Sequence, residues 1–126
     1  MPLTATCHCG AIRIEVDRAP ENATACTCTY CSKSGALWAY YRPDEVRIIT
    51  ADNDKIYAPR GMNLHHFCAN CGTNTYGDTP DWSETDIGND TPSVPTARKI
   101  GLNVKLFDDF DLTGLPIVEI DGRNLW

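Results

Sequence analysis

Hydrophobic residues in this chain recur mainly at every second position, which is the period of a β-strand. Two stretches show the alternation most clearly, residues 11–16 and residues 99–106, where isoleucine, leucine and valine alternate with polar or small residues. Shorter stretches are rich in the β-branched and aromatic residues that suit a pleated surface, and they span residues 37–41, 46–49, 55–57, 63–67, 74–76 and 117–120. No stretch repeats at the helical period. The pattern predicts a mainly β protein.

Proline, glycine and aspartate mark the connections between these strands. Turns are expected at Pro43-Asp44, at Pro59-Arg60-Gly61 and at Asp121-Gly122, and the polar stretch from Gly77 to Thr96 is expected to form one long loop. Loops of that length are usually functional or disordered. Because no linker or repeat interrupts the 126 residues, we expect a single domain over residues 1–126.

Seven cysteines stand in three tight clusters, which comprise Cys7 and Cys9, then Cys26, Cys28 and Cys31, then Cys68 and Cys71. Cysteines two or three positions apart can converge on one metal ion, whereas a disulfide within Cys-x-Cys would be strained. Residues 1–6 show no basic region followed by an apolar run, so no secretory signal is expected and the expected compartment is the reducing cytoplasm. Metal binding is therefore favoured over a disulfide framework.

The spacing also indicates how the cysteines divide between two metal sites. Glycine follows the last cysteine of the first cluster (Gly10) and of the third (Gly72), and a residue free to adopt positive φ lets backbone amides point at the sulfurs. These two clusters together offer four thiolates, enough for a closed tetrahedral zinc site of the structural kind. Zinc is the usual metal of such sites, with an iron–sulfur cluster as the alternative. The expected ligands are Cys7, Cys9, Cys68 and Cys71.

The middle cluster supplies only three thiolates and leaves one coordination position open, so it is the candidate catalytic zinc site: Cys26, Cys28 and Cys31. Zinc with three thiolates carries a net charge near −1 and polarises a carbonyl or a water weakly. It accepts a further soft ligand, such as a thiol, and holds it as a nucleophilic thiolate. A thiol or thiol adduct is thus the expected substrate. The alternative is a second structural zinc completed by His65, His66, an acidic side chain or a partner's residue.

Charge and hydropathy exclude two classes of partner. The chain has 11 basic and 17 acidic residues, a formal net charge of −6, and no basic stripe that could neutralise the phosphates of a nucleic acid. No apolar run approaches the roughly 20 residues of a membrane span.

A zinc deaminase is also excluded, because the sequence contains no His-x-Glu pair. The oligomeric state is left open.

The chain resembles the glutathione-dependent formaldehyde-activating enzyme family, which includes centromere-protein-V-like proteins. The motifs that carry this resemblance are Cys7-His8-Cys9-Gly10-Ala11, Cys26-x-Cys28-x-x-Cys31 with Gly35, Phe67-Cys68-x-x-Cys71-Gly72-Thr73, Gly101-Leu102-Asn103-Val104, and the ending Asp121-Gly122-Arg123 with Trp126. They cover nearly the whole chain. The resemblance implies an Mss4-like fold of small antiparallel sheets around zinc, with the structural and the catalytic zinc divided as above.

The family's namesake reaction joins formaldehyde and glutathione to give S-hydroxymethylglutathione, formally a carbon–sulfur lyase reaction in reverse. The resemblance therefore implies a zinc-dependent enzyme whose partners are glutathione, or another small thiol, and an aldehyde. The alternative is a non-catalytic module for protein interaction or chaperone activity. Zinc would cross-link this module, and its long loop would contact a partner.

Several residues outside the cysteine clusters are candidates for secondary roles. Cations that could pair with glutathione carboxylates are Lys33, Arg42 and Arg60. Aromatic residues that could wall a pocket are Trp38, Tyr40 and Tyr41, and either tyrosine could donate a proton. Of the adjacent pair His65 and His66, one is expected to face inward and the other outward, since side chains alternate along a strand. Ordinary surface or packing roles are the more common outcome for each residue, and His8 is expected only to shape its loop.

Overall fold

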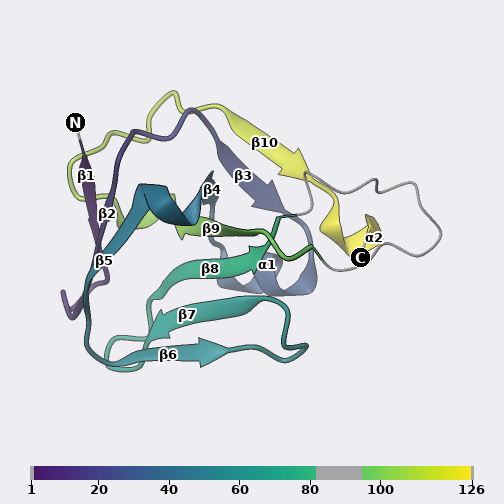
Figure 1. The fold of residues 1–126 in the computed structure, drawn as a ribbon. Helices are drawn as coiled ribbons and strands as arrows, with labels where there is room; N and C mark the ends of the chain where they lie inside the picture. The colour runs from purple at the N-terminus through teal and green to yellow at the C-terminus, as the bar shows by residue number, and fades with distance from the viewer. Residues whose placement is uncertain (1, 82–94, 126) are drawn as a thin grey trace.

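The computed structural model describes residues 2–81 and 95–125, whose strands form two β-sheets (Figure 1). The smaller sheet has three strands in the order β1 (Leu3–Thr6), β2 (Ile12–Val16), β5 (Val46–Ala51). The larger has seven, in the order β10 (Ile117–Ile120), β3 (Ala23–Cys26), β4 (Trp38–Tyr41), β9 (Arg98–Asn103), β8 (Asn74–Pro80), β7 (Leu64–Cys68), β6 (Asp54–Tyr57). The prediction of a mainly β protein is confirmed.

Strand pairing is antiparallel throughout the described residues, except that β10 pairs with β3 in parallel. This pair brings the C-terminal strand beside the segment that leads into the middle cysteine cluster, with Ile120 opposite Cys26. Figure 1 shows the large sheet fanning from β10 at the top right to β6 at the bottom. Sequence-distant segments therefore meet at the middle cluster.

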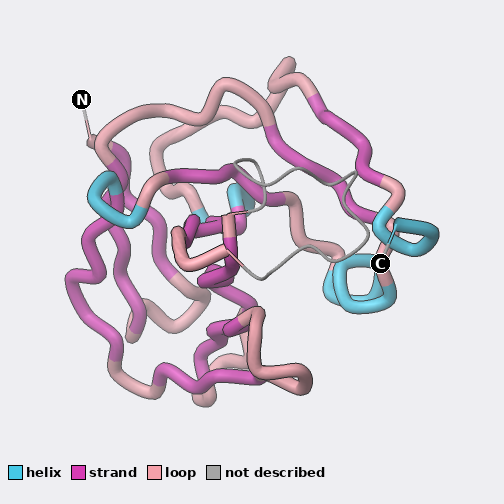
Figure 2. Tube along the Cα trace, turned by 45° about the vertical axis from the view of Figure 1, so that its right-hand side comes forward, coloured by secondary structure: helices cyan, strands magenta, loops and turns pink. Residues whose placement is uncertain are grey.

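Two short helices accompany the sheets, α1 (Thr29–Ser34) after β3 and α2 (Gly122–Leu125) after β10. They lie together at one side of the molecule in Figure 2. The alternation of the sequence predicts no helix, because six residues are too few to display a helical period. The structure shows what forms α1 instead: Cys28 is its N-cap, and Gly35 ends it in the left-handed region at φ 70°. No helix of the described residues is long and apolar enough to cross a membrane.

Eight of the strands occupy stretches where the sequence predicts them, most with shifted ends, and two predictions need correction. The expected strand over residues 99–106 stops at Asn103, whose side chain accepts a hydrogen bond from the Lys105 amide at 3.2 Å and starts a 3₁₀ turn, Val104–Leu106. The expected loop from Gly77 to Thr96 is strand up to Pro80, and residues 82–94 lie outside the described part of the chain.

Strands β1 and β3 are the two that the sequence does not predict. Their sequences, Leu-Thr-Ala-Thr and Ala-Thr-Ala-Cys, carry alanine and threonine where larger hydrophobic residues would mark an alternation. Pairing holds them in place, since β1 forms a hairpin with the neighbouring β2, while β3 pairs with the distant β10 and with β4. The turns predicted at Pro43-Asp44 and Pro59-Arg60-Gly61 form, and the Gly61 amide closes the second by bonding the carbonyl of Ala58 at 3.2 Å. The third predicted turn, Asp121-Gly122, instead leads into α2.

The hydrophobic core lies between the small sheet and one face of the large sheet. The small sheet contributes its alternating residues Ile12, Ile14 and Val16, each at most 1% exposed. The large sheet contributes Leu102, which is fully buried, and Tyr41. Burial of such side chains stabilises the fold by about 1.5–3 kcal/mol each. The opposite face of the large sheet lies outside this core.

Replacing the central core residue should show how much the packing contributes. We expect Leu102→Ala to lower the free energy of unfolding by about 2–5 kcal/mol, because it removes buried methyl groups and leaves a cavity. Ile49→Ala, at a site 46% exposed on β5, is the matched control and should cost less than about 1 kcal/mol. Urea unfolding of the metal-loaded protein measures both. Equal losses would contradict the placement of the core.

Candidate metal centres

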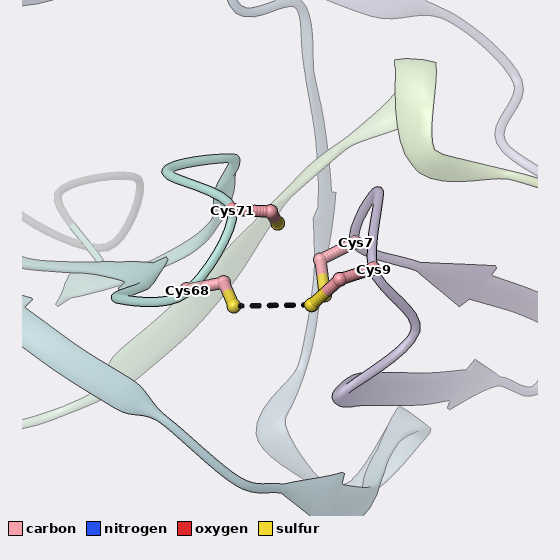
Figure 3. Close-up of side chains that lie close together, drawn as sticks. All are labelled: Cys7, Cys9, Cys68 and Cys71. Carbon is pink, nitrogen blue, oxygen red and sulfur yellow. Dashed lines mark hydrogen bonds between the residues drawn. The ribbon is translucent and has the colours of Figure 1, made fainter.

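The first and third cysteine clusters meet in the structure, as the sequence predicts. The sulfur of Cys9 lies 3.7 Å from that of Cys7 and 3.7 Å from that of Cys68, and the ligand atoms of these residues and Cys71 all lie within 4.8 Å of one another. Figure 3 shows the four side chains pointing toward a common centre from two loops. We call this group the four-sulfur cluster.

The geometry of the four-sulfur cluster fits a zinc ion. Tetrahedral coordination with zinc–sulfur bonds of about 2.3 Å places neighbouring sulfurs about 3.8 Å apart. The two residues that follow the clusters, Gly10 and Gly72, have φ of 83° and 77°, so the predicted left-handed positions are confirmed. Their turns are closed by bonds of their own amides to the carbonyls of Cys7 at 3.0 Å and Cys68 at 2.8 Å. Glycine suits both turns because its backbone adopts positive φ at no steric cost.

Hydrogen-bond donors around the four-sulfur cluster favour the thiolate form of its cysteines. The Ile12 amide donates to the sulfur of the buried Cys7 at 3.3 Å. The Thr73 hydroxyl lies 3.2 Å from the sulfur of Cys71, and this hydrogen bond is the main reason that the pKa of the Cys71 thiol falls to about 5. Metal ligands must be deprotonated, so such contacts prepare the site for a cation.

The four-sulfur cluster connects the two sheets. Cys7 and Cys9 follow β1 in the small sheet, while Cys68 ends β7 and Cys71 lies just before β8 in the large one. Cys68 is fully buried and belongs to the core. These four cysteines could hold a metal ion that ties both layers together.

The middle cluster forms a separate group, the three-sulfur cluster, at the end of β3 and the start of α1. The sulfurs of Cys26, Cys28 and Cys31 all lie within 4.8 Å of one another. Over residues 2–81 and 95–125, no other His, Cys, Asp or Glu offers an atom that completes this group, so neither His65 nor His66 serves as a fourth ligand there. The three residues could hold a metal ion, with part of its coordination left open.

Three N–H groups point at the sulfurs of the three-sulfur cluster. The Cys28 amide donates to Cys26 at 3.5 Å, the Cys31 amide to Cys28 at 3.4 Å, and the Trp38 indole N–H to Cys31 at 3.3 Å. Burial raises the pKa of the Cys31 thiol to about 12, against the opposing effect of the Trp38 bond. A thiol in such surroundings needs a cation to hold it as a thiolate, which is the role a bound metal plays.

The aromatic residues after the cluster divide between the two faces of β4. Trp38 and Tyr40 lie on the face that carries the three-sulfur cluster, while Tyr41 packs in the core and its hydroxyl donates to the carbonyl of Arg18 at 3.3 Å. Tyr40 is 37% exposed and its ring lies under the Lys99 ammonium, 4.1 Å from the centroid. Of the predicted pocket residues, Trp38 and Tyr40 therefore remain candidates, whereas Tyr41 does not.

The two histidines face opposite sides of β7, as predicted. His66 is 8% exposed, bonds Asp54 at 2.8 Å and stacks on Tyr76 in the interior. His65 is half-buried on the other face and stacks on the Tyr30 ring with centroids 3.8 Å apart. Burial lowers the pKa of His65. His65 is therefore the histidine on the side of α1.

The predicted carboxylate-binding cations are not gathered at the cluster. Arg42 pairs with Asp44 at 3.1 Å and is committed to the turn after β4. Arg60 is an exposed residue of the turn before β7, and Lys33 is exposed on α1. His8 is likewise exposed. None of these four side chains forms a hydrogen bond or an ion pair with the three-sulfur cluster in the described structure.

Sequence reasoning missed the polar residues that surround α1. Tyr30 and Asn74 bond through the phenol and the amide, and the Asn103 amide donates to the Asn74 carbonyl at 3.0 Å. The sequence could have indicated Asn103, because it is a polar residue at a buried strand position between Leu102 and Val104. It could not have indicated Tyr30 and Asn74, because their meeting depends on α1 packing over the sheet.

Comparison with known proteins identifies the family. A family model described as glutathione-dependent formaldehyde-activating enzyme matches residues 2–91, a range that holds all seven cysteines. The chain belongs to this family. A crystal structure of a Rhodobacter sphaeroides protein, a structural-genomics target, resembles this member of the family at 27% identity with a TM-score of 0.69, covering 92% of this chain and 100% of that one. A search of curated proteins gives no significant match.

Serine variants in each cluster should separate the two metal sites of this family member. Cys68→Ser should unfold or aggregate the protein, because metal-binding energy of a buried zinc site is folding energy. Cys28→Ser should keep the fold and lower bound zinc from two equivalents to one. Native mass spectrometry and circular dichroism measure both variants. A well-folded Cys68→Ser protein with full zinc content would contradict the expected division of roles.

The indole bond to Cys31 should tune the second metal site. Trp38→Phe keeps an aromatic ring but removes the N–H donor, and loss of such supporting contacts weakens metal affinity by about 10–100-fold. Zinc competition with a chelator should show the loss at one site only. Tyr41→Phe, which removes a buried hydroxyl bond on the opposite face of β4, is the control. Unchanged zinc affinity in Trp38→Phe would assign the indole to packing alone.

Proposed function

We propose that this chain is a zinc-dependent carbon–sulfur lyase-type enzyme that forms or cleaves S-hydroxymethylglutathione, the adduct of glutathione and formaldehyde. The observation that supports the proposal most directly is the three-sulfur cluster: three convergent thiols without a fourth protein ligand in the described chain. Family membership supports the substrates, since the family is named for this activity.

The residues present fit two zinc ions in different roles. Cys7, Cys9, Cys68 and Cys71 would hold a structural ion, while the catalytic ion would be held by Cys26, Cys28 and Cys31. A zinc ion in the open site would accept the thiol of glutathione as a further ligand and favour its thiolate form. The soft, anionic donor set suits this task better than the activation of water.

The protein groups around the open site would orient the ligands and manage the proton. Trp38 fixes the Cys31 sulfur through its indole N–H, and the Cys31 amide fixes Cys28. In the synthetic direction the sulfur of glutathione forms a bond to the carbonyl carbon of formaldehyde, and the proton lost from the thiol ends on the carbonyl oxygen. Burial, followed by the nearby cysteines, raises the pKa of Tyr40 to about 12. Its phenol therefore stays protonated at neutral pH and is the candidate donor to that oxygen.

An exchange measurement tests the proposed reaction. Glutathione and formaldehyde combine slowly in water, so the zinc-loaded protein should accelerate exchange between free formaldehyde and S-hydroxymethylglutathione, followed by NMR exchange spectroscopy. Cys28→Ser should reduce this acceleration at least about 100-fold, because the thiol loses its metal site. Lys33→Met, an exposed change on α1, should leave it intact.

The negative result is equally informative. A protein that binds two zinc ions but accelerates no exchange would contradict the proposed reaction. A retained rate in Cys28→Ser would place the chemistry elsewhere in the molecule.

A further inference from the structure

A groove of about 650 Å³ opens between α1 and the end of the large sheet. Tyr30 of α1 forms one wall, Tyr57 and Phe67 form another, and the floor carries the side chains of Asn74 and Asn103, with Lys105 at the rim. Its volume lies within the range of about 300–1,000 Å³ that small-molecule sites occupy. The cysteine clusters themselves do not line it.

The groove lies next to the three-sulfur cluster along two routes. Tyr30, which lines the groove, directly precedes Cys31 in α1. Asn103 on the floor is the direct cross-strand partner of Trp38, whose indole N–H bonds the Cys31 sulfur. These two links place the groove beside the three-sulfur cluster, where the rest of a molecule held by its sulfur would lie.

The walls of the groove combine aromatic surface with amide groups. The Tyr30 and Tyr57 rings are roughly parallel, with centroids 6.3 Å apart and an interplanar angle of 26°. The Asn103 amide donates to the Asn74 carbonyl and the Asn74 amide contacts the Tyr30 hydroxyl, so these polar groups are fixed in place. Fixed amides and hydroxyls between apolar walls suit a ligand that is itself a peptide.

The charge of the groove favours an anion. Among the described residues, those that line it include no Asp or Glu, although acidic residues outnumber basic ones in the chain. Lys105 is the one cation of its described lining, and the Lys105 ammonium donates to the carbonyl of Gly35 at 2.8 Å, at the end of α1. An ammonium has three donor hydrogens, so this bond leaves others for a ligand. The Lys105 side chain is thus held at the rim with donor capacity to spare.

We propose that this groove binds the non-reacting part of a small peptide thiol, with a carboxylate of the ligand bonded to Lys105. The inference rests on the proposed function, because it takes the reacting sulfur to lie at the three-sulfur cluster. It adds a second recognition site, which distinguishes a carboxylate-bearing peptide thiol such as glutathione from a thiol without a peptide.

The test compares two thiols and a non-reacting analogue on the zinc-loaded protein. Glutathione carries the peptide and its carboxylates, 2-mercaptoethanol carries neither, and S-methylglutathione carries the peptide but no free thiol. Lys105→Met removes the charge, Lys105→Arg keeps it, and Lys33→Met removes an exposed charge from α1 outside the groove. Formaldehyde exchange gives kcat and KM for the thiols, and calorimetry gives the Kd of S-methylglutathione.

Lys105→Met should raise the KM for glutathione and the Kd for S-methylglutathione at least tenfold, the effect of losing a charge-assisted hydrogen bond of about 1.5–3 kcal/mol. Its kcat with glutathione and its kinetics with 2-mercaptoethanol should change less than about twofold. Lys105→Arg should recover most of the affinity, and Lys33→Met should match the unmodified protein. This selective loss also excludes a mere loosening of α1, which would impair both thiols.

Equal kinetics of the unmodified protein with the two thiols, or an equal effect of Lys105→Met on both, would overturn the groove and leave the proposed reaction standing. Inactivity with both thiols would overturn the proposed reaction. The S-methylglutathione titration, which needs no reaction, then decides the groove alone: binding that depends on Lys105 supports it, and absence of binding overturns it.

Discussion

The convergence of four sulfurs from two sheets is the constraint on which the rest of this structure depends. Cys9 and Cys68 lie 59 positions apart in the chain, yet their sulfurs are 3.7 Å apart. Cys7 and Cys68 are almost completely buried, and thiolates in such positions are stable only beside a cation. The small sheet buries one face on the large sheet, and a metal ion held at this point would fix the relative position of the two layers. Folding and metal binding are then a single process.

The three-sulfur cluster depends on the fold in a different way. Its ligands come from one six-residue segment, Cys26 to Cys31, and α1 begins within that segment. The segment is held on the outer face of the large sheet by β10 and by the Thr27 hydroxyl, which donates to Asp121 at 2.9 Å. A ligand set supplied locally can lose its metal without separating the two sheets. This difference is a physical reason to expect a structural role for the four-sulfur cluster and a catalytic role for the three-sulfur cluster.

The sequence predicted the parts of this structure that follow from local pattern. Alternation located strands such as β2 and β9, and cysteine spacing with the two glycines located both clusters. What it could not supply depends on distant partners. β3 is recognisable only by its pairing with β10, and α1 is too short for a helical period. The position of Asn74 beneath Tyr30 follows from the packing of α1, 44 residues away in sequence.

The negative net charge of the protein increases the importance of Lys105, the one cation among the described residues that line the groove. Glutathione carries two carboxylates and one ammonium, so it approaches a chain of net charge −6 as an anion of about −1. Its thiolate form would add a further negative charge at a cluster of three thiolates. Salt screens the repulsion from distant carboxylates, since the Debye length is about 8 Å at physiological ionic strength. Charges within the groove are screened much less, and there no acidic side chain of the described lining opposes Lys105. Local charge can thus favour a peptide thiol although the net charge of the whole chain opposes it.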